Sequence, residues 1–423
     1  MSRSRFFIIS LVSTTLYEFL MSALKPTGFS VTKVVITFLA WNAFVFSLFY
    51  AISNFNLIKQ KIPRLAYVFF VALVIWNITG IVKGFLDGSM AATTLFGNAY
   101  TSLAMLVPLA MPFGLDKSHL RIVNRYFLIL IAVGIISGLI TLFTSLISET
   151  EGPILGLPSL FVYLVAFLIT TLRFQSSKHQ TIILAAGAIQ FIFAGLVGGS
   201  RATIARILLL FFSLMLLGMY RKFNMRWIPA VAMLAFLIPF YFVYTGTVTG
   251  QSFLTGARSY VLDTVGTTQS TRFLEKADTR TFLYREIFDD LIHNDHFLTG
   301  KGSGGTYFSP YFFFSGHDID QRFTSEVGLL ALLLKGGVIG VFLNLCLFLT
   351  AMFLAFYRAN NYYVSAIGFM LLVHVLILFV ENLVSYNLYN YAIWFFVGIC
   401  LSSEIRSLND DQIKELLIGE ANA

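Results

Sequence analysis

Charged residues are scarce in this chain: they make up 12% of its 423 residues, against roughly 25% in soluble domains. With 57% apolar residues, so little charge cannot cover the surface of a soluble protein of this length. A soluble enzyme of two or three domains is therefore excluded. Cysteine is almost absent, and its two copies, Cys346 and Cys400, both stand in apolar runs. This excludes a disulfide framework and a thiolate metal site.

What the chain does contain is a series of apolar runs of bilayer length, about 20 residues each. The sequence therefore predicts an all-α polytopic membrane protein with about twelve transmembrane helices. The predicted spans are 5–23, 33–53, 65–86, 91–113, 124–144, 154–172, 181–199, 202–219, 227–246, 323–357, 361–381 and 388–405. The tenth would measure about 52 Å as one helix. We therefore expect a break at Gly336-Gly337, with a separate helix near the outer surface before it.

The distribution of lysine and arginine predicts the orientation of these spans. With the amino terminus inside, the inner loops hold sixteen of these residues and the short outer loops hold four, Lys25, Lys33, Lys83 and Arg201. This bias predicts that both termini are cytoplasmic, and it accounts for most of the net charge of +8. The charge is therefore not taken as a sign of nucleic-acid binding. No cleavable signal peptide is expected, because the first apolar run lacks an A-x-A-like site and further spans follow.

The predicted spans divide the chain into four parts. Residues 1–246 hold nine spans, 247–322 form a long outer loop, 323–406 hold three spans, and 407–423 form a cytoplasmic tail. The outer loop is polar, and the stretch 280–296 carries apolar residues at helical spacing, so we expect a folded periplasmic subdomain. No internal repeat is visible, which gives no support to the inverted-repeat plan of secondary transporters.

A predicted outer hairpin carries the clearest candidate site. One apolar span ends at Gly199-Ser200-Arg201, and the next span holds Arg206. Guanidinium groups at the water–lipid boundary suit the diphosphate of a lipid-linked donor. The alternative is that these arginines anchor the hairpin by reaching to lipid head groups.

The outer loop contributes further candidates. Arg280 and Arg285 flank an aromatic, helix-like run, where they either bind substrate or belong to a solvated charged face. The run Gly300–Gly305 either binds phosphate through backbone N–H groups or forms a flexible turn. It is not a nucleotide-binding P-loop, because the lysine and hydroxyl residue that end that motif are missing.

Glu326 heads a run that is otherwise apolar to Leu334. Its carboxylate is a candidate general base, or it forms an ion pair with Arg322 four residues earlier. His293, His296 and His317 are also predicted on the outer side, but their spacing matches no zinc motif, so no metal is expected.

Three motifs in this order resemble those of the O-antigen polymerase and O-antigen ligase superfamily of bacterial membrane glycosyltransferases. The hairpin Gly199-Ser200-Arg201 is similar to the family's S-R hairpin. Arg280-x-x-x-Tyr284, followed by His296-Phe297-Leu298-Thr299-Gly300-Lys301-Gly302-Ser303-Gly304, resembles R-x-x-x-W … P-l-x-G-x-G-x-G. Glu326-Val327-Gly328-Leu329-Leu330 … Gly337-Val338-Ile339-Gly340 resembles H-N-x-Y-L … G-I-I-G.

The chain departs from these patterns at several positions. Tyr284 replaces a tryptophan, His296 a proline, and Glu326 the family's histidine. A ligase is expected to keep that histidine, so the departure favours a polymerase. His317, in the outer loop, is the other candidate for the histidine's role.

The resemblance implies a GT-C-like helical fold and glycosyl transfer at the periplasmic face of the bacterial inner membrane, without metal or cofactor. It implies undecaprenyl-diphosphate-linked repeat units as donor and acceptor, membrane lipid as surroundings, and a chain-length regulator and a flippase as pathway partners. The residues it marks as catalytic are Glu326, Arg201 and Arg280. Those it marks as substrate-binding are Arg206, Arg285, Arg322, Tyr284 and His317.

Three alternatives stay open on the sequence alone. An O-antigen ligase would transfer the finished polymer to lipid A core. A flippase or transporter for lipid-linked oligosaccharides also fits twelve spans, although the long outer loop and the few charges at mid-membrane depth disfavour it. A non-catalytic protein of envelope assembly is the third.

Overall fold

A computed structural model of the chain describes residues 3–24, 30–86, 99–147, 164–165, 167–196, 212, 215–220, 223, 227–234, 241, 281–309, 321–379 and 381–418. The first half holds α1 (Arg3–Leu24), α2 (Val31–Ser53), α3 (Phe55–Lys61), α4 (Arg64–Leu86), α6 (Ala99–Ser102), η1 (Leu103–Leu115), α7 (Ser118–Ile147), η2 (Leu172–Phe174) and α9 (Ser177–Leu196). The second half holds α11 (Trp227–Leu234), α15 (Thr281–His293), β1 (Tyr307–Phe308), β2 (Gln321–Arg322), α17 (Gly328–Tyr357), α18 (Tyr362–Ile377), α19 (Leu388–Leu401), α20 (Ser403–Ser407) and α21 (Asp410–Ile418).

The described part of the chain is helical apart from one short antiparallel pair, β1 with β2, in which Tyr307 faces Arg322. Five of its helices, α1, α2, α4, α7 and α17, are long and apolar enough to cross a membrane, and η1, α18 and α19 are shorter apolar helices. The architecture is therefore that of an all-α membrane protein. The full count of twelve spans stays a prediction, because several predicted spans, such as 202–219, fall largely outside the described residues.

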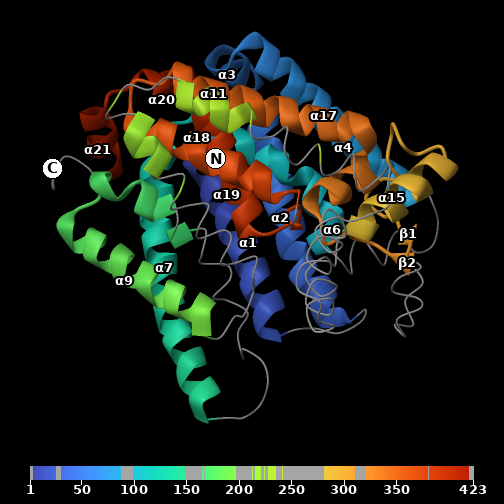
Figure 1. Ribbon diagram of the computed structural model, residues 1–423, viewed down its shortest axis with the longest axis horizontal. Helices are drawn as coiled ribbons and strands as arrows, with labels where there is room; N and C mark the ends of the chain where they lie inside the picture. The colour runs from blue at the N-terminus through green and yellow to red at the C-terminus, as the bar shows by residue number, and fades with distance from the viewer. Residues whose placement is uncertain are drawn as a thin grey trace, which may run out of the picture.

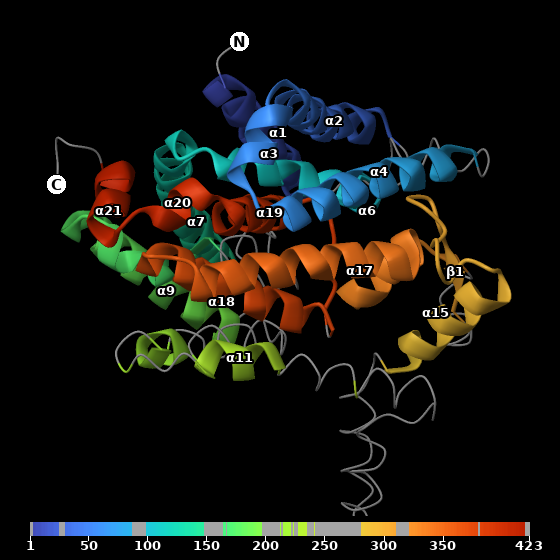
Figure 2. The ribbon, with the colours of Figure 1, turned by 90° about the horizontal axis from the view of Figure 1, so that it is seen from above.

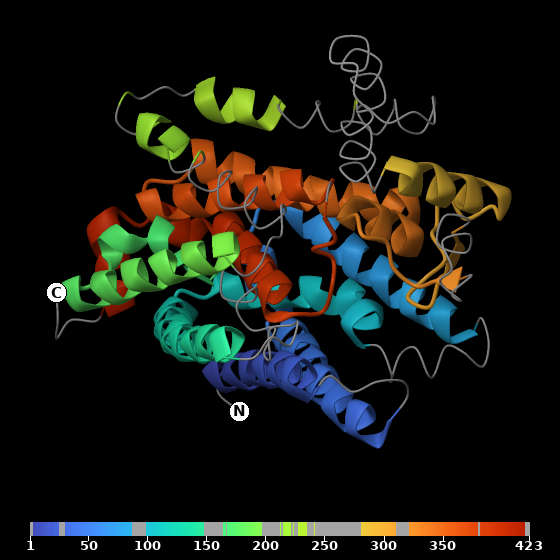
Figure 3. The same ribbon diagram turned by 60° about the horizontal axis from the view of Figure 1, so that its bottom comes forward.

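The helices pack in layers (Figures 2 and 3). The hairpin of α1 and α2 lies on one side, and α17 with α18 lies toward the other, with α11 outside them. Between them lie η1 and α19, which pack closely against each other. Along α17 the molecule has two ends (Figure 1): α15 and the β1–β2 pair lie at one, and α20 and α21 lie at the other. We call these the α15 end and the C-terminal end.

The central segment η1 differs from the prediction of an α-helical span over 91–113. Residues Leu103–Leu115 form a 3₁₀ helix that is buried along its whole length. Pro108 and Pro112 explain the difference, because two prolines four residues apart remove two backbone donors from an α-helix. Close packing against α19 offsets part of this cost. A Cβ atom on Gly114 would lie 2.0 Å from the carbonyl oxygen of Phe395, so the two backbones touch.

The helix α17 is interrupted at Gly337, one of the two glycines where the sequence predicts a break. Its φ of 64° and ψ of −170° are non-helical. That backbone region is open essentially only to glycine. The part that follows the break has roughly 20 residues, which is about 30 Å of helix and the thickness of a bilayer core. The part before the break, from Gly328, is a separate short helix at the α15 end.

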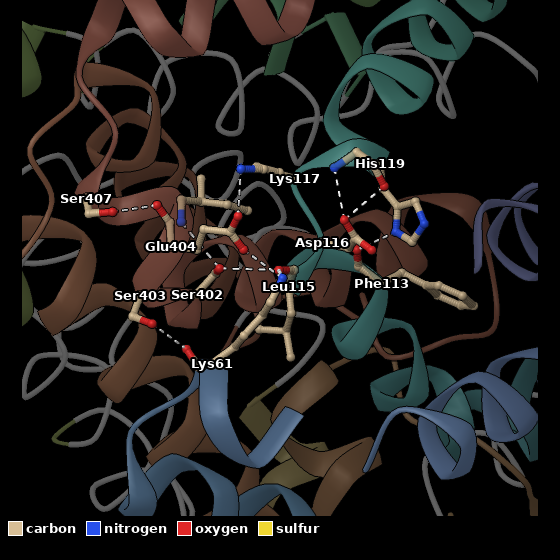
Figure 4. A network of polar contacts seen from close by, with 12 residues as sticks. Lys61, Phe113, Leu115, Asp116, Lys117, His119, Ser402, Ser403, Glu404 and Ser407 are labelled. Atoms are coloured by element: carbon tan, nitrogen blue, oxygen red, sulfur yellow. Dashed lines mark hydrogen bonds and ion pairs between the residues drawn. The ribbon is translucent and has the colours of Figure 1, made fainter. Parts of the chain in front are cut away.

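A network of polar contacts ties the helices together at the C-terminal end (Figure 4). The Glu404 carboxylate forms ion pairs with Lys61 at 2.7 Å and Lys117 at 2.9 Å. Beside it, burial raises the pKa of the Asp116 carboxyl, but hydrogen bonds from the backbone and hydroxyl of Ser118, with neighbouring positive charge, outweigh burial and lower that pKa. The network joins α3, the start of α7 and α20. Its two lysines, Lys61 and Lys117, both come from loops predicted on the inner side.

Candidate active site

The candidate site lies at the α15 end, where α15, the β1–β2 pair and the first turns of α17 meet (Figure 1). Helix α15 is amphipathic: Leu283, Ile287 and Leu291 are buried, and Arg285 is exposed on the other face. Its apolar face packs against α17, so the helix predicted within 280–296 is present and docked. This docking sets where the helix lies relative to α17.

Tyr284 anchors α15 to the end of α18. Its hydroxyl donates a hydrogen bond to the carbonyl oxygen of Phe379 at 2.6 Å, and burial raises the pKa of the phenol well above its ordinary value. The side chain is only 7% exposed, so it has little surface to offer a substrate. Its observed contact is a structural one, and the substrate-binding role that the resemblance implies for it stays a prediction.

Residues 297–303, which we call the strap, lie across the break in α17. The backbone N–H groups of Val338 and Ile339, just after the break, donate to the carbonyl oxygens of Phe297 and Leu298 at 3.0 and 3.3 Å. In an unbroken helix these N–H groups would bind carbonyls one turn earlier in the same helix. The strap therefore replaces the acceptors that the break removes.

The strap also supplies donors to the carbonyls before the break. The N–H of Lys301 donates to Leu334 O at 2.7 Å, and the N–H of Gly302 donates to Lys335 O at 3.0 Å. The break thus leaves both sides of α17 hydrogen-bonded, as backbone buried away from water requires.

The glycines of the strap allow it to approach two helices at once. Gly300 and Gly302 have φ values of 69° and 79°. A Cβ on Gly302 would lie 2.5 Å from Gly80 O in α4, and one on Gly300 would lie 2.4 Å from Lys335 O in α17. The N–H of Ser303 donates to that same Gly80 carbonyl at 3.1 Å. The run Gly300–Gly305 is therefore neither the phosphate-binding loop nor the flexible turn that we considered, because its backbone is bound to α4 and α17.

Two lysines hold the strap in place by their side chains. Lys83, at the end of α4, donates to Gly300 O at 2.7 Å, and its Nζ lies 3.4 Å from His296 Nδ1. Lys301 forms an ion pair with Asp290 of α15 at 2.5 Å and donates to Thr306 O at 2.9 Å. Sequence reasoning missed the contacts of Lys83, because residue 83 lies more than 200 positions from both of its partners.

Arg322 and Glu326 come together where the chain enters α17. Arg322 Nη2 lies 3.4 Å from Glu326 Oε1, and Arg322 Nη1 lies 3.5 Å from the Tyr307 hydroxyl. Burial raises the pKa of that phenol to about 12, while the positive charge of Arg322 lowers it. The side chain of Glu326 is 39% exposed, and that of Arg322 is 19% exposed. Of the residues predicted for the site, these two are in direct contact, and the carboxylate is accessible.

The turn that carries Glu326 is held by Asn382. The Asn382 side chain donates to Ser325 O at 2.7 Å and to Thr324 Oγ1 at 2.8 Å. The N–H of Gly328 donates to Glu381 O at 3.0 Å. Glu326 therefore stands just before α17, on a turn fixed by the segment that follows α18.

The other predicted residues separate into two groups. Arg285 is exposed on α15 and pairs with Asp289 at 3.6 Å. Arg201, Arg206, Arg280 and His317 lie outside the described residues. Sequence reasoning missed Tyr307 and Asn382, which frame the Arg322–Glu326 pair from a strand and a loop with no motif.

Comparison of the chain with protein-family models, with curated proteins and with solved structures finds no match. The site is therefore interpreted from its own geometry and from the motifs in the sequence.

Proposed function

We propose that this chain is a membrane glycosyltransferase that joins lipid-linked oligosaccharide repeat units into a surface polysaccharide. The observation that carries the proposal is the Arg322–Glu326 pair. It places an accessible carboxylate beside an arginine, just before the start of α17. A general base has to be accessible and to keep its orientation. The Glu326 side chain is 39% exposed and lies 3.4 Å from Arg322, which supports this role.

In the proposed reaction Glu326 accepts the proton of an acceptor sugar hydroxyl. The hydroxyl oxygen forms a bond to the anomeric carbon of the donor, and the bond from that carbon to the diphosphate oxygen breaks. The electron pair leaves with undecaprenyl diphosphate, whose charge needs stabilisation more than protonation. Arginine side chains supply this stabilisation. Arg201 and Arg280 are the arginines proposed for it on the resemblance.

The distribution of charge supports the proposed topology. Two cations of the predicted inner loops, Lys61 and Lys117, meet at the C-terminal end, where they share Glu404. Lys83, predicted on the outer side, lies at the α15 end instead. We therefore propose that the α15 end faces the periplasm and the C-terminal end the cytoplasm of a bacterial inner membrane.

The test is polymer growth by purified protein supplied with lipid-linked repeat units. Glu326→Gln keeps the size of the side chain but removes the base, so we expect at least a 100-fold lower rate. Glu286→Gln is the matched control: it alters another carboxylate at the same end, one that accepts from Ser309 at 2.6 Å, and should leave the rate within tenfold. Similar rates for both variants and the wild-type protein would overturn the role of Glu326.

The acceptor distinguishes the polymerase from its nearest alternative. A polymerase extends lipid-linked repeat units, whereas a ligase needs lipid A core as acceptor. Transfer to lipid A core alone would replace the proposed polymerase by a ligase, and movement of the lipid across vesicles without glycosyl transfer would replace it by a flippase.

A further inference from the structure

We infer that a cavity inside the helix bundle, next to the break in α17, binds a small singly charged anion. The cavity lies between α4, η1, α17, α18 and α19. Its polar lining consists of Lys335, Asn77, Asn344, His374 and Asn390. This inference does not depend on the proposed glycosyl transfer, because none of these residues belongs to the Arg322–Glu326 site.

Lys335 brings an amino group into the bundle. Lys335 lines the cavity and is 3% exposed, on the last turn of α17 before Gly337. The backbone carbonyl of Lys335 is held by Gly302 of the strap, which fixes the turn that carries the side chain. Ionisable groups at this depth are expensive and mark binding or transport sites by default. A positive charge in a low-dielectric cavity attracts an anion far more strongly than it would in water.

Three asparagine residues add neutral donors to the lining of the same cavity. Each is buried and is anchored by one amide hydrogen on a backbone carbonyl. The anchoring bonds join Asn77 to Met105 O at 2.6 Å, Asn344 to Gly340 O at 2.8 Å and Asn390 to Ser385 O at 3.1 Å. An amide nitrogen carries two hydrogens, so each keeps a second N–H. An ammonium group with several N–H donors forms an environment for an anion.

The size of the cavity limits the ligand. It holds about 30 Å³. A single water molecule needs roughly 10–15 Å³ by the same measure. A diphosphate or a sugar ring is therefore too large, and the ligand is a halide or a single carboxylate group. Chloride and a small carboxylate both carry one negative charge on a compact group, and either could be the ligand.

Binding is measured on the full-length protein in detergent, in buffers of constant ionic strength. Sodium gluconate, whose anion is too large for the cavity, is replaced stepwise by sodium chloride or by sodium acetate. We expect the thermal unfolding midpoint to rise saturably, by roughly 5 °C at concentrations well above Kd. A chloride response indicates a halide ligand, and a response to acetate alone indicates a carboxylate. An equal midpoint in all three salts overturns the inference.

A second measurement reads the cavity directly. Trp394 lines it, so bromide bound there quenches tryptophan fluorescence with a saturable component. Trp227, which is 59% exposed, adds a component that rises linearly with bromide. Trp394→Phe should reduce the saturable component and leave the linear one unchanged, with Trp76, which donates to Gly336 O in the cavity lining, as the second reporter. Quenching that stays linear in the wild-type protein contradicts the inference.

Lys335→Met removes the cation while keeping an unbranched side chain of similar length. The variant should lose both the shift in midpoint and the saturable quenching. Lys59→Met, which removes an exposed lysine at the end of α3, should keep both. If Lys335→Met does not accumulate as folded protein, Asn344→Leu serves instead, with at least a tenfold weaker chloride affinity expected. A chloride response that neither variant changes excludes this cavity as the binding site.

Discussion

Replacing Gly337 by alanine tests the break in α17. The residue has φ 64° and ψ −170°, and a Cβ there would lie 2.2 Å from Leu298 O in the strap. A non-glycine residue in that region costs about 1–3 kcal/mol. Pushing Leu298 away also weakens the bonds that Val338 and Ile339 donate to the strap, about 1 kcal/mol each.

The variant has one way to relax, which is to straighten α17. Alanine favours a helix over glycine by about 1 kcal/mol. Straightening would return the N–H groups of Val338 and Ile339 to carbonyls of α17, but it would leave the strap without four of its backbone bonds. We therefore expect Gly337→Ala to lower the free energy of unfolding by about 3 kcal/mol, a large share of the 5–15 kcal/mol typical of folded proteins.

Equilibrium unfolding in mixed micelles, followed by tryptophan fluorescence, measures this difference. Gly218→Ala is the matched control, because Gly218 lies in a helical stretch and a Cβ there meets nothing within 4 Å. The free energy of unfolding of that variant should equal that of the wild-type protein or exceed it by up to about 1 kcal/mol. If Gly337→Ala unfolds within about 0.5 kcal/mol of the wild-type protein, the strap does not stabilise the break and the reasoning above fails.

Two further substitutions test the two ends of the bundle in the same unfolding assay. Tyr284→Phe deletes the hydrogen bond to Phe379 O and should lower the free energy of unfolding by about 1–2 kcal/mol, and an unchanged value would contradict the anchoring of α15. Asp116→Asn should lower it by about 1 kcal/mol near pH 7, since the native contacts lower the pKa of this carboxyl. A carboxyl of this kind stabilises the fold above its unfolded pKa of about 3.9, and the contribution disappears as the pH falls through the folded pKa. The difference from the wild-type protein should therefore shrink as the pH falls below about 3.9; a difference that does not change with pH would assign the effect to packing.

Patterns within one segment were predicted well. Apolar runs of bilayer length correctly predicted α1, α2 and α4. The break at Gly337 was predicted from the double glycine, because one unbroken helix of that length exceeds the thickness of a bilayer. Apolar residues at helical spacing gave α15, where Ile287 and Leu291 are buried. In these cases the physical cause lies within the segment itself.

Contacts between distant segments could not be predicted in this way. The prediction treated Gly300–Gly305 as a separate loop. In the structure, Gly300 and Gly302 lie so close to the backbones of α17 and α4 that a larger side chain would not fit. The expected ion pair of Arg322 with Glu326 is present, but Tyr307 and Asn382, which complete the setting, come from other elements. The residue pattern of one segment does not show which distant segment it will pack against.

The strap also has a consequence for the order in which the chain assembles. Its partner in α4, Gly80, is synthesised long before it, and its partner in α17 follows it. During synthesis the strap can therefore dock on α4 first. The carbonyls of Phe297 and Leu298 are then in position to accept hydrogen bonds from α17. The N–H groups of Val338 and Ile339 then find acceptors as soon as the last part of α17 enters the membrane. In that order of assembly, the strap would supply the acceptors that the broken helix lacks by itself.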